Sequence, residues 1–141
     1  ITDCHPANHS SFVEFGGIWP PHCVEGTRGG AIHESFYTKV ENPANRPDPK
    51  RNIFRKGCKQ DEEQYSGFEA VNSNGIALKD YANKDVVVSG IATEYCVRNT
   101  AEEFLKSGRN VELILSGLGY VDFEGHKKTI KELREIMTVV E

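Results

Sequence analysis

The chain has 141 residues, of which 38% are hydrophobic, and a formal net charge of −4. These values fit one domain with a single core, and they leave no basic surface for nucleic acid and no cationic face for a membrane. No membrane-spanning run or signal peptide is visible, and the four cysteines match no zinc or redox spacing, so we expect reduced thiols in a cytoplasmic protein. Because the sequence opens as if within a strand, we expect one domain over residues 1–141 that is incomplete at its N-terminus.

The first half of the sequence predicts an irregular structure. Residues 1–3 read as the end of a strand, and residues 7–30 are rich in Gly, Pro, Asn and Ser, which favours an ordered loop. The prolines of residues 42–49 predict a turn-rich connection. A further strand is expected over residues 52–56.

The second half alternates strands with helices. A β-branched run over residues 85–91 is typical of a strand in a parallel sheet, and a helix is expected from Thr93 or Glu94 to about Lys106. The remaining expected elements are a strand over 110–115, a helix over 123–137 and a strand over 138–140. This order predicts an α/β fold with helices on the faces of a parallel sheet.

Candidate functional residues follow the ends of the expected strands. They are Asp3 and His5, then Lys56, then residues 91–96. Since ligands in such folds bind beyond the carboxyl ends of the strands, we expect these residues to serve one site.

The first of these groups has the composition of a metal site. Asp3 and His5 are two residues apart, so on an extended chain they point to the same face, and His22 arrives from a Trp-Pro-Pro corner. One carboxylate and two imidazoles form the ligand set of an open divalent-metal site, although each residue taken singly also fits a structural role. A fourth ligand is left open between His9 and Glu14. The other histidines, His33 and His126, are expected to be ordinary surface residues.

Cys96 lies in the first turn of the helix expected after residue 92. The N–H groups and the dipole of a first turn favour a thiolate, and they can also hold an oxyanion. A buried cysteine packed against the sheet fits this segment equally well. A cation from Lys56 would favour the thiolate further.

Five blocks of the sequence carry a family resemblance. They are Asp-x-His-Pro-x-Asn-His-x-Ser-Phe from Asp3, Trp-Pro-x-His-Cys-Val from Trp19, Lys-Gly from Lys56, Tyr-Ser-Gly-Phe from Tyr65, and Gly-x-Ala-Thr-Glu-Tyr-Cys-Val from Gly90. In this order they resemble the nicotinamidase/pyrazinamidase family of isochorismatase-like cysteine hydrolases. The resemblance runs from Asp3 to about Gly108.

The resemblance implies a three-layer α/β/α fold with a mostly parallel sheet. It identifies Asp3, His5 and His22 as ligands of one divalent metal, zinc, with iron or manganese as alternatives. The family's first strand and helix, and the general-base Asp of its Asp-x-Gln motif, have no counterpart in this sequence.

The resemblance also implies a cysteine mechanism. Cys96 is then the nucleophile that forms a thioester and releases ammonia, with Lys56 as the catalytic lysine near the thiol. A cis peptide bond between Ile91 and Ala92 would help to aim the N–H groups of Ala92 and Cys96 into an oxyanion hole. The pocket residues around the substrate ring are then Trp19, Tyr95 and Ile91.

The function implied by the resemblance is a metal-dependent nicotinamidase of NAD salvage that also accepts pyrazinamide. Two alternatives stay open: an isochorismatase-like amidase with another amide substrate, and a catalytically inactive relative that binds a ligand or a metal. The sequence leaves open whether the protein is a homo-oligomer.

Overall fold

The computed structural model describes residues 1–141, which fold into two compact units. Unit 1 comprises Ile1–Gln64 and Glu69–Leu78, and unit 2 comprises Tyr65–Phe68 and Lys79–Glu141. All strand pairs in the two sheets are parallel, and helices alternate with strands in unit 2, which confirms the α/β class. The chain contains no helix with the length and apolarity that a membrane span requires.

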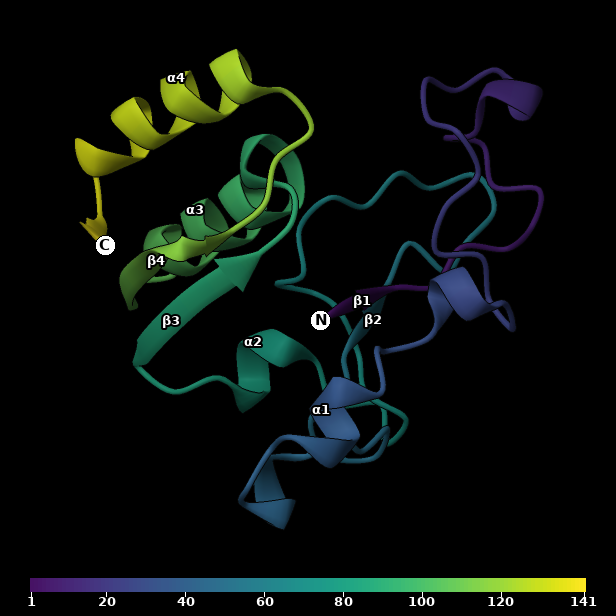
Figure 1. The fold of residues 1–141 in the computed structure, drawn as a ribbon, viewed down its shortest axis with the longest axis horizontal. Helices are drawn as coiled ribbons and strands as arrows, with labels where there is room; N and C mark the ends of the chain where they lie inside the picture. The colour runs from purple at the N-terminus through teal and green to yellow at the C-terminus, as the bar shows by residue number, and fades with distance from the viewer. The chain divides into compact units, whose positions relative to one another are not determined.

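Unit 1 is built on a two-stranded parallel sheet. Strand β1 (Thr2–Asp3) lies beside β2 (Arg55–Lys56), and Asp3 is opposite Lys56 in the register (Figure 1). The strand expected over residues 52–56 is therefore limited to its last two residues. The reason is local, because the amide of Ile53 donates to the carbonyl of Asp48 and so belongs to the preceding turn.

The remaining elements before β3 are single helical turns. They are the 3₁₀ turns Val13–Phe15, Arg28–Gly30 and Pro43–Asn45, and the short helices α1 (Ser35–Thr38) and α2 (Leu78–Tyr81). The expectation of an ordered loop over residues 7–30 and of a turn-rich connection after residue 42 is confirmed.

Unit 2 contains a three-stranded parallel sheet with the strand order β3-β4-β5. The strands are β3 (Asp85–Gly90), β4 (Asn110–Leu118) and β5 (Thr138–Val140). Helix α3 (Arg98–Lys106) connects the first two strands, and α4 (Phe123–Arg134) connects the last two (Figure 1).

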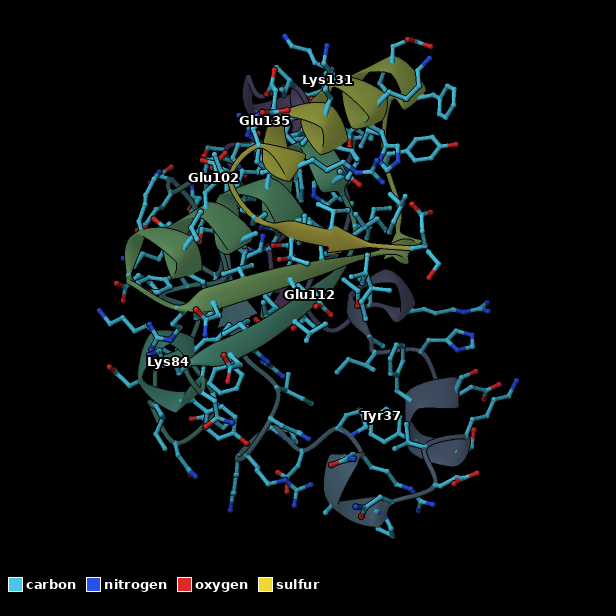
Figure 2. The ribbon with its side chains drawn as sticks, turned by 90° about the vertical axis from the view of Figure 1, so that its left-hand side faces the viewer. Tyr37, Lys84, Glu102, Glu112, Lys131 and Glu135 are labelled. Carbon is cyan, nitrogen blue, oxygen red and sulfur yellow. The ribbon has the colours of Figure 1, made fainter.

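Both helices of unit 2 cover the same face of its sheet. Leu113 of β4 and Leu133 of α4 are fully buried, and each such side chain contributes about 1.5–3 kcal/mol through its burial. Figure 2 shows Glu102 of α3 and Lys131 of α4 on the side of the helices, whereas Glu112 of β4 points to the other side of the sheet. The neighbours Glu112 and Leu113 lie on opposite faces of the sheet because successive side chains of a strand alternate between its two faces.

The two helices of unit 2 differ from the expectation, one in the type of its first turn and the other in its end. The helix expected from Thr93 begins as a π-helical turn, Thr93–Val97, and continues as α3. Helix α4 ends at Arg134 rather than at Met137, because the amides of Glu135 and Ile136 turn back three residues, to the carbonyls of Glu132 and Leu133.

Candidate functional site

Unit 1 brings together the three residues expected to bind a metal. Asp3, His5 and His22 each offer one ligand atom, and these atoms all lie within 4.8 Å of one another. The ring centroids of His5 and His22 are 5.0 Å apart, in an edge-to-face arrangement. A cluster of one carboxylate and two imidazoles therefore exists in the folded unit.

The backbone explains how His22 reaches His5. Cys23, directly after His22, adopts a left-handed conformation with a φ of 47°. The next residue, Val24, forms a parallel β-bridge with His5. In this bridge the amide of His5 donates to the carbonyl of Cys23 at 3.1 Å, and the amide of Glu25 donates to the carbonyl of His5 at 2.9 Å. His22, which follows the Trp-Pro-Pro corner, therefore lies near the end of β1.

Backbone carbonyls orient both imidazoles of the cluster. Nδ1 of His5 donates to the carbonyl of Gly57, and Nδ1 of His22 donates to the carbonyl of Pro20, each at 2.8 Å. Because a carbonyl only accepts, each neutral ring carries its proton on Nδ1 and keeps the lone pair of Nε2 for a metal. The residues present therefore fit a divalent cation.

Burial favours the neutral form of His5. Its side chain is 3% exposed, and desolvation lowers its pKa below the ordinary value, although the Gly57 carbonyl and the Asp3 carboxylate act in the opposite direction. A neutral imidazole is the form that binds a metal.

Neither residue considered as a fourth ligand lies in the cluster of three. His9 is fully buried, its Nδ1 accepts from the amide of Ser11 at 3.2 Å, and its Nε2 contacts the carbonyl of Glu62 at 3.2 Å. Both ring nitrogens of His9 are thus engaged within the protein. Glu14 lies exposed in the turn Val13–Phe15.

Lys56 is held next to the same cluster. Its side chain is only 4% exposed, and its ammonium donates to the Asp3 carboxylate and, at 2.9 Å, to the carbonyl of Gln64. The side chain of Gln64 in turn accepts from the amide of Gly57. A buried ammonium needs such partners, and the sequence contained no signal that Gln64 supplies one.

In unit 2, Cys96 lies half-buried in the π-helical turn after β3. The peptide bond between Ile91 and Ala92 is cis. The amides of Tyr95 and Val97 both donate to the carbonyl of Ala92 at 3.1 Å, which closes the turn around Cys96.

The three residues assigned to a substrate pocket lie in different parts of the chain. Trp19 of unit 1 is half-buried, with its ring 6.3 Å from that of His22. In unit 2, the ring of Tyr95 is 5.5 Å from that of Tyr65, and Ile91 is 70% exposed.

None of the four cysteines forms a disulfide. Cys4 is buried, and its burial, followed by the proximity of Cys58, raises its pKa to about 11. Cys4 therefore stays a protonated, unreactive thiol at neutral pH.

One histidine differs from its expected role. His126 is half-buried rather than an ordinary surface residue, and its Nδ1 lies 2.9 Å from the hydroxyl of the fully buried Thr93. The sequence held no periodic signal for this contact, because the contact joins two elements that lie far apart in the chain.

Comparison with known proteins places the chain in a family. The isochorismatase domain model matches residues 1–141. The chain is 32% identical to the nicotinamidase/pyrazinamidase of Mycobacterium tuberculosis over 92% of its own length and 66% of that protein, so it spans slightly less than two thirds of this relative.

Two solved structures are similar to the chain. The pyrazinamidase of Pyrococcus horikoshii, in complex with zinc, is 35% identical, with a TM-score of 0.79 over 99% of this chain and 72% of that protein. PnC1 of L. infantum, in complex with nicotinate, is 33% identical, with a TM-score of 0.80 over 99% and 69%.

The chain belongs to the isochorismatase family. Within that family, the proteins it resembles are nicotinamidases and pyrazinamidases.

Proposed function

We propose that the protein is a metal-dependent nicotinamidase that hydrolyses nicotinamide, and also pyrazinamide, to the acid and ammonia. The observation that supports this most directly is the cluster of Asp3, His5 and His22, whose two imidazoles both present Nε2 to a cation. Similarity to nicotinamidases and pyrazinamidases supports the choice of substrate.

The cluster in unit 1 holds the cation, which we assign as zinc, with iron or manganese as alternatives. Zinc is present in the similar Pyrococcus horikoshii structure. A cation bound there would supply a Lewis acid, which would orient the substrate through its ring nitrogen. Asp3 also accepts from the ammonium of Lys56, so the ligand and the lysine are positioned together.

Cys96 performs the covalent chemistry in this proposal. Its sulfur attacks the carboxamide carbon, the C–N bond breaks, and the thiol proton leaves with the ammonia. Water then cleaves the thioester and regenerates the thiol. The N–H groups of Ala92 and Cys96 hold the oxyanion, and Lys56 is the catalytic lysine of this proposal.

The same proposal takes residues 1–141 as one hydrolase domain of a cytoplasmic protein in NAD salvage, with Trp19, Tyr95 and Ile91 around the substrate ring. That the cluster of Asp3, His5 and His22 and the turn that carries Cys96 act on one substrate is a prediction of this proposal. An amidase with another amide substrate is the alternative, and a panel of amides distinguishes the two.

The test is ammonia release from nicotinamide by the full-length protein that carries this sequence, with and without a chelator. Release that falls on chelation and returns with added zinc supports the proposal. A folded, zinc-loaded protein that releases no ammonia from nicotinamide overturns it, and release from another amide would then identify the alternative.

A further inference from the structure

The turn that carries Cys96 is attached to the connection between β4 and α4 by a network of hydrogen bonds. Thr93, the first residue of the turn, is fully buried, and both its amide and its hydroxyl donate to the carbonyl of Gly119, at 2.9 and 2.8 Å. The next residue, Glu94, accepts from the amides of Val121 and Asp122 at 3.1 and 2.7 Å. The turn is thus fixed at its first two residues.

His126 of α4 completes this network from the other side. Its Nδ1 is 2.9 Å from the hydroxyl oxygen of Thr93, and its ring packs against Tyr120 with the ring centroids 4.9 Å apart. A hydroxyl has one proton, and that of Thr93 is given to Gly119. The Thr93 hydroxyl can therefore bond to both Gly119 and His126 only if His126 donates from Nδ1.

We propose that His126 is a positioning residue for the proposed reaction. By donating to the hydroxyl of Thr93, it keeps that hydroxyl directed at Gly119 and holds the turn that carries Cys96 and the N–H group of Ala92. It lies outside the sequence blocks that carry the family resemblance. The inference rests on the proposed function only for the expected change in kcat.

The hydrogen bond has a spectroscopic signature that does not depend on activity. In the folded full-length protein at mildly alkaline pH, nitrogen NMR of the histidine side chains should show His126 with its proton on Nδ1. The Thr93→Val variant should abolish this preference. A proton on Nε2 in the unmodified protein overturns the inference.

The kinetic test compares two substitutions at the same position. His126→Phe keeps a ring against Tyr120 but has no donor, and kcat for nicotinamide should fall about tenfold with little change in KM, because the turn acts on the transition state. His126→Asn places an amide nitrogen close to the position of Nδ1 and should restore most of kcat. His33→Phe, an exposed histidine of unit 1, is the matched control and should leave kcat unchanged.

A double-mutant cycle separates positioning from general destabilisation. If His126 acts through the hydroxyl, His126→Phe should lower kcat no further in a Thr93→Val background. Equal kcat losses in His126→Phe and His126→Asn, or additive losses in the cycle, overturn the inference.

Failure of the proposed function is distinguishable from failure of this inference. If the unmodified protein hydrolyses no nicotinamide, the proposed function falls, and amide hydrogen exchange over residues 92–97 decides the inference instead. Exchange should be faster in His126→Phe and normal in His126→Asn, and equal exchange in both variants contradicts the role of His126.

Discussion

His5 donates a hydrogen bond from Nδ1 to the carbonyl of Gly57 at 2.8 Å, and this contact joins the end of β1 to the residue that follows β2. The bond leaves Nε2 for a cation. It also requires glycine at position 57, since a Cβ there would lie 2.5 Å from Cε1 of His5 and the φ of Gly57 is +62°.

Gly57→Ala should therefore displace the His5 ring and weaken zinc affinity by about 10- to 100-fold, the usual effect of losing the partner that orients a ligand. Zinc titration by calorimetry measures the change. Gly75→Ala is the matched control, because Gly75 has a φ of +77° but no atom within 4 Å of the added methyl group. It should lose about 1 kcal/mol of unfolding free energy and keep its zinc affinity.

His22→Ala should lose stoichiometric zinc and bind nicotinamide more weakly, because one of the two imidazoles in the cluster is removed. Metal analysis of the purified protein and equilibrium dialysis with nicotinamide check the two effects. His33→Ala, which changes an exposed histidine, should retain both. Unchanged zinc content in His22→Ala would refute the assignment of this ligand.

Cys96→Ala should lower ammonia release by about a thousandfold or more, as expected for loss of a covalent nucleophile, while zinc content stays the same. The control is Cys58→Ala, which removes an exposed thiol and should leave turnover intact. Substantial turnover by Cys96→Ala would exclude a thioester on this residue.

The stability of the chelator-treated protein should fall as the pH drops below about 6.5. Burial lowers the pKa of His5 in the folded protein from its ordinary value of 6.5, so the unfolded chain takes up the proton first. The stabilisation is complete above the unfolded pKa and is lost as the pH falls towards the folded pKa.

Urea unfolding at several pH values measures this dependence, and His5→Asn should flatten it. If the unmodified protein and His5→Asn lose the same unfolding free energy over this pH range, burial of His5 does not cause the pH dependence.

The α/β class and the residue types of the cluster of Asp3, His5 and His22 could be predicted from local patterns in the sequence. The β-branched run of β3 and the alternation of strands with helices are local patterns, and the spacing of Asp3 and His5 is a property of any extended segment. Such features depend on residues near one another in the chain, so periodicity reveals them.

The groups that hold these side chains in place could be learned only from the folded units. The bond of His5 to Gly57, the bonds of Lys56 to Asp3 and Gln64, and the engagement of His9 by Glu62 join segments about fifty residues apart or depend on such pairing. The contact of His126 with Thr93 is of the same kind. Periodicity carries no information about such pairs, because the pairing of β1 with β2 and the packing of α4 bring them together only in the folded units.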